Sequence, residues 1–234
     1  HTPTKINYVL PTNGISDNIL LEQITSYKEQ DEARWKDGQV SGGIYHGGAE
    51  HLALQNEALA MFAVSNPLHG DVWPSAMKME AEIISMTANL VNGGDTEVCG
   101  SITSGGTESI IMSVKTHRAW AEARGITEPE IIGCFSSHAG LDKACDMLKI
   151  KLIKTPFHPE SYEMMVEEVA KHITRNTIMI FSSAPNYPFG IIDPIKSLSF
   201  LPKINGLIPF GSLIATKPTP LIMNKTEYAP FSLR

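Results

Sequence analysis

The sequence predicts an α/β fold in which a largely parallel β-sheet is covered by helices. From residue 98 onward, short apolar runs typical of buried strands alternate with helical patterns. Such alternation requires crossover connections, which favour parallel pairing of the strands. With 42% hydrophobic and 19% charged residues, the 234-residue chain holds enough apolar material for one globular domain, or for one domain and part of another.

The composition argues against several classes of protein. The formal net charge is −6 and the Lys and Arg residues are scattered, so no basic stripe is available for nucleic acid. The three cysteines form no C-x-x-C pair, which predicts reduced, buried thiols. No stretch approaches the roughly 18 consecutive apolar residues of a membrane-spanning helix. The chain starts at His1 with a polar segment unlike a signal peptide, so we expect a soluble protein with an incomplete N-terminus.

Residues 1–95 are expected to form an N-terminal segment whose helices lead into the α/β domain. One helix is predicted over Ser16–Trp35 and another over Ala49–Val64. Between them, the glycine-rich segment 41–48 predicts either a simple turn or a loop that brings Tyr45 or His46 close to a ligand. A third helix is predicted from Ser75, with four apolar residues on one buried face: Met79, Ile83, Met86 and Leu90.

Residues 96–195 are expected to form a partial α/β domain that binds a cofactor. Strands are predicted at Val98–Thr103, Ile131–Phe135, Ile150–Lys154 and Ile178–Phe181. The helices predicted between them are Thr107–Arg124, Ala139–Leu148 and Glu160–Ile173. We expect the strands to form one parallel sheet with helices on its faces.

Residues 196–234 do not continue this pattern. The segment contains five prolines, no Asp, no His and one acidic residue, Glu227. Proline removes backbone donors and interrupts helices and central strands, so the segment is predicted to be irregular and loosely packed. One interpretation is that it derives from a different reading frame or splice end.

The first predicted strand leads into a candidate phosphate-binding turn. Ligands of open parallel sheets bind beyond the carboxyl ends of the strands. Here Ser104, Gly105, Gly106 and Thr107 lead directly into a helix, so backbone N–H groups, hydroxyls and the positive end of the helix dipole converge. The segment matches neither the P-loop nor the dinucleotide-binding glycine pattern. A plain glycine turn capped by Thr107 is the alternative.

Two further strand ends carry polar residues. His138 follows the second strand, where an imidazole is suited either to lie against a planar ligand or to act as an acid or base. An incidental histidine in a helix-capping segment would look the same. The polar turn 182–190 follows the fourth strand, so three strand ends of the predicted sheet carry residues suited to a ligand.

Four motifs resemble those of the sphingosine-phosphate lyases in order and spacing. They are Ser-Asn-Pro-Leu-His at 65–69, Thr-Ser-Gly-Gly-Thr-Glu-Ser at 103–109, Ser-x-His at 136–138 and Gly-Ile-Ile-Asp-Pro at 190–194. The glycine-rich segment 41–45 is similar too, and the resemblance covers roughly residues 12–195. It implies the front part of a fold-type-I pyridoxal-phosphate domain, which is aspartate-aminotransferase-like, truncated here and related to the group II amino-acid decarboxylases.

The resemblance also implies roles for individual residues. Ser104, Gly105, Gly106 and Thr107 would hold the phosphate of pyridoxal 5′-phosphate, and His138 would stack on its pyridine ring as a catalytic residue. Tyr45 and His69, both catalytic, would face the substrate together with Asn66, in part across a homodimer interface. The implied reaction is the retro-aldol cleavage of a long-chain base phosphate to a fatty aldehyde and phosphoethanolamine, with the ring as electron sink. The implied location is the endoplasmic reticulum membrane, with a cytosol-facing catalytic domain, in a eukaryote, or the cytoplasm in a bacterium.

The sequence departs from the family pattern just after Ile195. The family supplies an Asp to the pyridine nitrogen and a lysine to the cofactor beyond this point, and Asp193 belongs to the matched turn instead. Of the tail lysines, Lys225 lies in the segment closest to the family's lysine motif, but no Asp-x-His precedes it. We therefore predict a catalytically inactive chain. The alternatives are an intact lyase that uses a tail lysine, an amino-acid decarboxylase, and a non-catalytic α/β domain for another phosphorylated ligand.

Overall fold

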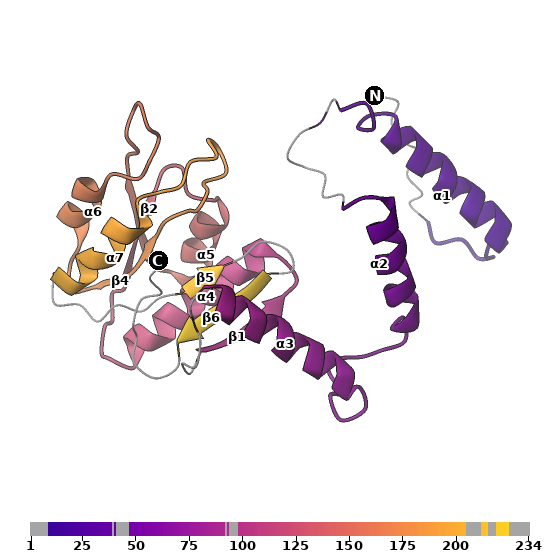
Figure 1. The fold of residues 1–234 in the computed structure, drawn as a ribbon, viewed down its shortest axis with the longest axis horizontal. Coiled ribbons are helices and arrows are strands. Elements are labelled where there is room, and N and C mark those ends of the chain that lie inside the picture. Colours follow the sequence, from indigo (N-terminus) through magenta and orange to yellow (C-terminus); the bar gives the residue numbers. More distant parts are fainter. Residues whose placement is uncertain are drawn as a thin grey trace. The chain divides into compact units, whose positions relative to one another are not determined.

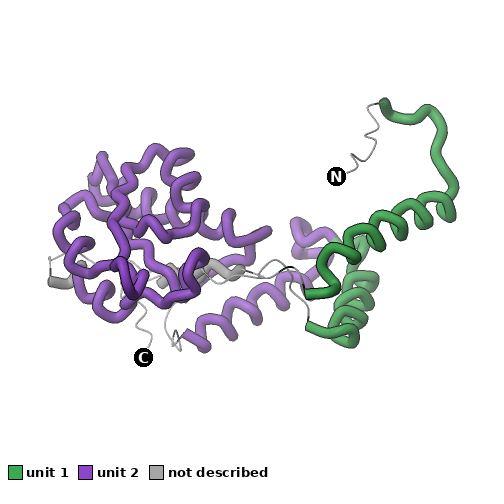
Figure 2. Tube along the Cα trace, turned by 90° about the horizontal axis from the view of Figure 1, so that it is seen from above, with its two compact units in different colours: residues 1–65 green, residues 66–234 purple. Residues whose placement is uncertain are grey.

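The computed structural model describes residues 9–38, 40, 47–91, 93, 98–204, 212–214 and 219–224. The chain divides into two compact units, residues 1–65 and 66–234 (Figure 2). This division falls earlier than the predicted boundary at residue 95. The reason is that α3 (Pro74–Leu90) contacts two strands of the second unit, β1 (Val98–Thr103) and β6 (Thr219–Asn224).

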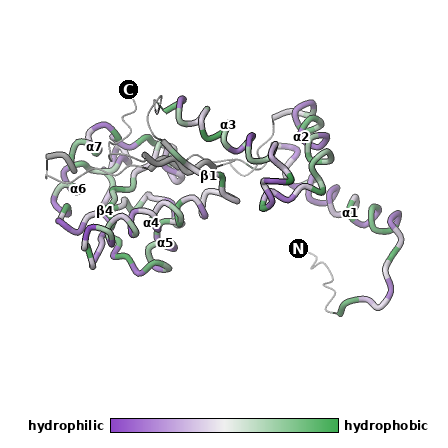
Figure 3. The backbone as a smooth tube through the Cα atoms, turned by 90° about the horizontal axis from the view of Figure 1, so that it is seen from below, coloured by the Kyte–Doolittle hydropathy of each residue, from purple (hydrophilic) through white to green (hydrophobic). Residues whose placement is uncertain are grey.

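The first unit contains the helices α1 (Asp17–Glu32) and α2 (Ala49–Met61) (Figure 1). Hydrophobic and hydrophilic positions are mixed along both helices (Figure 3). Neither helix contains a buried residue, so apolar side chains such as Ile24 and Leu59 stay exposed in this chain. Each helix forms close to its predicted position.

The second unit contains the predicted parallel sheet. Its three strands are β2 (Glu130–Cys134), β3 (Lys151–Thr155) and β4 (Thr177–Phe181), and β2 lies in the centre. The helices α5 (Gly140–Leu148) and α6 (Val166–His172) connect consecutive strands. This β2-α5-β3-α6-β4 order confirms the predicted α/β class. Cys134 pairs with Thr155 and Gly133 with Phe181, so the carboxyl ends of the three strands lie at one edge.

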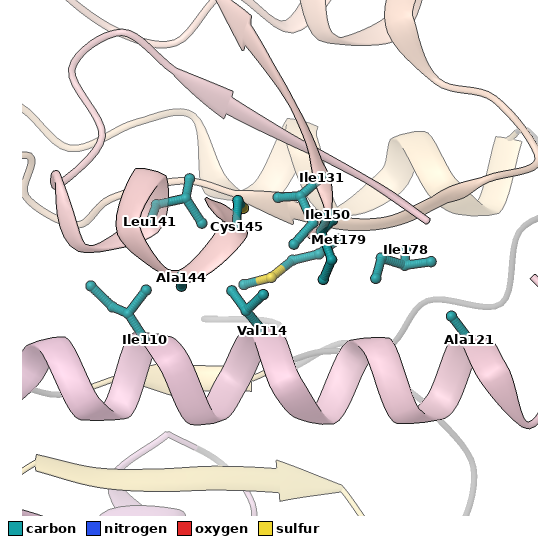
Figure 4. Close-up of a cluster of buried hydrophobic side chains, with 10 residues drawn as sticks. All are labelled: Ile110, Val114, Ala121, Ile131, Leu141, Ala144, Cys145, Ile150, Ile178 and Met179. Atoms are coloured by element: carbon teal, nitrogen blue, oxygen red, sulfur yellow. The ribbon is translucent and has the colours of Figure 1, made fainter. Parts of the chain in front are cut away.

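Two hydrophobic clusters cover the two faces of this sheet. Ile131 packs with residues of α5 and of α4 (Gly106–Glu122), as Figure 4 shows. The next residue, Ile132, packs in the other cluster with Met164 and with Leu198 of α7 (Ile195–Ile204). Successive side chains of a strand point to opposite faces, which explains this division. Among the cysteines of the clusters, burial raises the pKa of Cys145 to about 11, as expected for an inert thiol.

The first predicted strand does not join the parallel sheet. β1 pairs antiparallel with β6, which also pairs with β5 (Ser212–Ile214), so the order of this second sheet is β1-β6-β5. The expectation of a single parallel sheet was therefore wrong for β1. An apolar run predicts a strand but does not specify its partner. The helix that follows β1, α4, contacts strands of both sheets.

The prediction of an irregular segment 196–234 was also wrong for the residues of this segment that the structure describes. The helix α7 runs to residue 204, and β6 is the central strand of its sheet, with a ladder from Val98↔Asn224 to Thr103↔Thr219. Pro220 lies near the start of β6, where a strand tolerates proline, and α7 forms with Pro202 in its last turn. The predictions of a helix at 160–173 and of a buried face on α3 were each wrong in part.

The predicted helix at 160–173 begins only at Val166. Tyr162 has a positive φ of 60°, and Phe157 pairs with Met164 in an isolated bridge. These features make residues 158–163 a loop, which the apolar spacing did not reveal.

The predicted buried face of α3 is largely exposed. Met86 and Leu90 are 62% and 81% exposed, whereas Ala88 is buried. The face of α3 toward β1 carries Glu80, whose Oε1 accepts the N–H of Ile102 at 3.0 Å. Because β1 is the edge strand of its sheet, its outward N–H groups need acceptors, and a carboxylate supplies one where methionine would not.

Glu130 links β2 to β3 and to the segment before β4 at the amino-terminal edge of the parallel sheet. Its carboxylate accepts bonds from Lys151 Nζ on β3 and from Thr174 Oγ1 before β4, both at 2.7 Å. These two bonds, first that of Lys151, hold the pKa of Glu130 below its ordinary value of 4.5. The stabilisation is therefore present above about pH 4.5 and is lost as the pH falls through the lower folded pKa.

The substitution Glu130→Gln is expected to lower the free energy of unfolding at pH 7 by about 1–2 kcal/mol. This difference from the wild type should shrink as the pH falls below 4.5, the ordinary value, because the wild-type carboxyl then becomes neutral as well. Urea denaturation at several pH values measures it. Glu122→Gln, which removes an exposed ion pair with Arg118, serves as the control and should change little. A Glu130→Gln difference that does not vary with pH would contradict the assignment.

Candidate cofactor site

Hydrogen bonds on its buried side fix the turn between β1 and α4. Ser109 Oγ lies 2.6 Å from Thr103 Oγ1, which donates a hydrogen bond to the carbonyl oxygen of Gly105 at 3.0 Å. Ser109 is fully buried, whereas Thr107 is exposed. A Cβ placed on Gly105 would meet no heavy atom within 4 Å. The first turn of α4 therefore presents its N–H groups beside open space, which is the arrangement that an anion requires.

Glu108 engages the predicted phosphate ligand Ser104. Both the backbone N–H and the hydroxyl of Ser104 donate to Glu108 Oε2, at 2.7 and 2.5 Å. The bond from the hydroxyl, followed by that from the backbone, lowers the pKa of Glu108. The carboxylate thus binds the residue just before the N-cap of α4, Gly105, and fixes the approach of the chain to this helix. Ser104 can contact a phosphate through these donors only if Glu108 releases them.

His138 lies in the turn between β2 and α5. Its Nδ1 accepts the N–H of Gly140 at 2.9 Å, so in the neutral ring the proton is carried by Nε2. A Cβ on Gly140 would lie 2.9 Å from His138 Nδ1 and 3.0 Å from Ile110 Cδ1 on α4. The imidazole is therefore close to the first turns of α4, the helix that begins with the candidate cradle.

The other predicted site residues are not joined to this cluster by any contact within the described ranges. Asn66 Oδ1 accepts the N–H of Leu68 at 3.1 Å, and the ring of His69 lies 6.4 Å from that of Trp73. Both residues precede α3 in the second unit. Tyr45 lies outside the described residues, as do Gly42 and Gly43 before it.

The loop after β4 is fixed by two buried polar side chains, Asp193 and Asn186, whose structural role the sequence motifs did not predict. Asp193 accepts the N–H of Met164 at 2.9 Å and that of Ser183 at 2.7 Å, one with each carboxylate oxygen. Asn186 accepts the N–H of Phe189 at 3.0 Å. Because both oxygens of Asp193 bind backbone, this carboxylate is a structural clamp, in agreement with its exclusion as a partner of the pyridine nitrogen.

The described residues fit the phosphate end of pyridoxal phosphate. The donors at the start of α4 suit a phosphate, and a buried hydroxyl that lacks a hydrogen-bond partner, Ser136 Oγ, lies in the same turn as His138. Two carboxylates near the carboxyl edge of the parallel sheet already have partners. Asp193 accepts two backbone N–H groups, and Asp142 forms an ion pair with Lys154 at 2.8 Å. Lys225 lies outside the described residues.

Comparisons with known proteins identify relatives for most of the chain. Over 195 residues, 83% of the chain, it is 44% identical to a sphingosine-1-phosphate lyase of Dictyostelium discoideum. Over 191 residues it is 41% identical to a sphingosine-1-phosphate lyase of Saccharomyces cerevisiae. The matches cover 37% and 32% of those proteins, so the chain spans about a third of the length of these relatives. No family model matches the chain.

Solved structures give the same result. The sphingosine-1-phosphate lyase of Burkholderia pseudomallei is similar with a TM-score of 0.82 and 34% identity, over 86% of this chain and 48% of that chain. A glutamate decarboxylase of Lactobacillus brevis shares the fold, with a TM-score of 0.70 at 15% identity over 97% of this chain and 62% of that chain. The predicted fold-type-I architecture is thereby confirmed. Over the residues it shares with them, the chain belongs to the sphingosine-1-phosphate lyase branch of the group II pyridoxal-phosphate-dependent decarboxylase family.

Proposed function

We propose that this chain carries the phosphate-binding part of a pyridoxal-phosphate-dependent lyase for long-chain base phosphates. The observation that carries the proposal is the turn from Thr103 to Ser109, which is pinned from its buried side and directs the start of α4 toward open space. The position of His138 beside the same helix and the sphingosine-1-phosphate lyases among the relatives support it.

Each group in the cluster has a distinct task in this proposal. The N–H groups of Gly105, Gly106 and Thr107, with the Thr107 hydroxyl, bind the phosphate dianion at the positive end of α4. Ser104 joins them when Glu108 releases it. His138, oriented by the N–H of Gly140, offers its ring face and its Nε2 proton to the ligand. Once bound, the cofactor supplies an electron sink for the carbon–carbon cleavage.

We further propose that Tyr45, Asn66 and His69 face the phosphorylated substrate and that the chain works as a homodimer. The exposed apolar side chains of α1 and α2, neither of which buries a residue, support a surface that another subunit covers. In the part of the chain that the structure describes, no helix is long and apolar enough to cross a bilayer. We place the catalytic domain on the cytosolic side of the endoplasmic reticulum membrane in a eukaryote and in the cytoplasm in a bacterium.

A pair of substitutions at Gly105 tests the phosphate cradle. Gly105 is the N-cap of α4, where Asp and Asn are both favourable, and a Cβ fits there. Gly105→Asp places a negative charge against the phosphate, so the affinity for pyridoxine 5′-phosphate should fall by about tenfold or more. Gly105→Asn has nearly the same shape without the charge and should stay within about threefold of the wild type. Fluorescence titration measures both constants.

Pyridoxine 5′-phosphate is the preferred probe because it lacks the aldehyde and cannot react with surface lysines. Thermal unfolding provides the stability control, since both variants should unfold at or slightly above the wild-type temperature. Equal loss of affinity in the two variants would show that the cradle tolerates no side chain, irrespective of charge. Unchanged affinity in Gly105→Asp would place the phosphate elsewhere and overturn the proposal.

A further inference from the structure

Among the residues that the structure describes, one buried hydroxyl, that of Ser136, forms no hydrogen bond within the fold. Ser136 is 3% exposed, and its Oγ is buried without a hydrogen-bond partner in the described structure. Most buried polar side chains in folded proteins have a partner, because an unsatisfied hydroxyl loses its bonds to water and gains none. Ser136 therefore loses its bonds to water in the described structure without gaining a protein partner.

The neighbours of Ser136 in the same turn all form hydrogen bonds within the protein. Ser137 Oγ accepts the N–H of Cys134 at 3.0 Å, and Ser137 N–H donates to the Cys134 carbonyl oxygen at 3.0 Å. Phe135 N–H donates to the Thr155 carbonyl oxygen at 3.0 Å, and His138 Nδ1 accepts from Gly140. The turn is thus fixed without any contribution from the Ser136 hydroxyl.

The position of Ser136 points to a ligand. It lies two residues beyond the end of β2, the central strand of the parallel sheet, and two residues before His138. Ligands of open parallel sheets bind beyond this carboxyl edge. An unsatisfied polar group at such a place is a feature that proteins retain for function at a cost in stability.

We infer that Ser136 is a further ligand-binding residue, whose hydroxyl forms a hydrogen bond with a polar substituent of the hydroxypyridine ring held against His138. This inference rests on the proposed function. A serine hydroxyl both donates and accepts, so it suits a phenolic oxygen or a ring nitrogen in either protonation state. An ordered water is the other partner that a buried hydroxyl of this kind finds in proteins.

Adjacent serines provide a matched pair of variants. Ser136→Ala removes the unsatisfied hydroxyl, so the ligand-free chain should unfold at an unchanged or slightly higher temperature, by about 2 °C. Its dissociation constant for pyridoxine 5′-phosphate should rise about three- to tenfold. Ser137→Ala removes a hydroxyl that the fold uses, so its unfolding temperature should fall by about 2–4 °C with an affinity within about twofold of the wild type.

The combined readouts separate the possible outcomes. If Ser136→Ala lowers the unfolding temperature as Ser137→Ala does and leaves the affinity unchanged, Ser136 holds a structural water and the inference is overturned. If the wild type binds, loses affinity in Gly105→Asp, and binds equally well as Ser136→Ala, the inference fails while the proposed function stands. If the wild type shows no saturable binding of the probe, the proposed function fails and the inference fails with it.

Discussion

The substitution Asp193→Asn is expected to lower the free energy of unfolding by about 3 kcal/mol. Asp193 is buried and holds two segments together, because one oxygen accepts the N–H of Met164 and the other that of Ser183. Asparagine offers one oxygen and one NH₂ group. Whichever way the amide turns, its NH₂ group meets a backbone N–H, which leaves two donors opposed in a buried place.

Urea denaturation at pH 7 measures this effect, and Asp146→Asn is the matched control. The side chain of Asp146 is 83% exposed, and its only ion pair in the described structure is with Lys149 at 3.2 Å. The same change there should alter the free energy of unfolding by less than about 0.5 kcal/mol. If the two variants were equally stable, the carboxylate of Asp193 would not join the segment before α6 to the loop after β4.

The sequence predicted the local elements well where periodicity decides them. The strands β2, β3 and β4 lie within one residue of their predicted positions, because each is a short apolar run set between helical patterns. The order of strands and helices also predicted parallel pairing, since a crossover helix returns the chain in the same direction. The placement of His138 after the central strand followed directly from this order.

Long-range partners were not predictable in the same way. β1 and β6 are separated by more than a hundred residues, and nothing in either apolar run indicates that they pair. The tail was judged by its prolines, although β6 has Pro220 near its start, where a strand tolerates it, and α7 forms with Pro202 in its last turn. On α3, the methionine pattern predicted the buried face, whereas Glu80 faces β1 because an edge strand needs an acceptor.

The same limit applies to the candidate site. The motif Ser-x-His drew attention to His138, whereas Ser136 received no role because a sequence does not show which hydroxyl lacks a partner. Glu108 was part of a quoted motif, but its bonds to Ser104 depend on the geometry of the turn. Motifs therefore pointed to a candidate site, and the hydrogen bonds of the described residues distinguish its structural members from those that we propose for a ligand.

The chain by itself is expected to release no fatty aldehyde from a sphingoid base phosphate and to bind pyridoxal phosphate only weakly. The cradle at the start of α4 supplies the phosphate end of the site. An enzyme of this kind also needs a carboxylate that keeps the pyridine nitrogen protonated and a lysine that links to the aldehyde. The one carboxylate in the matched turn, Asp193, is occupied on both oxygens by backbone N–H groups.

Reduction with borohydride after incubation with pyridoxal phosphate, followed by peptide mapping, measures the covalent half of this prediction. Scattered, low-level labelling of exposed lysines is the expected result, because no Asp-x-His precedes a lysine in the tail sequence. An aldehyde assay on the same sample should remain at the level of a Gly105→Asp control. A single lysine labelled in stoichiometric amount, above all Lys225, together with aldehyde release that Gly105→Asp abolishes, would show that the tail completes the site and that the chain is a working lyase.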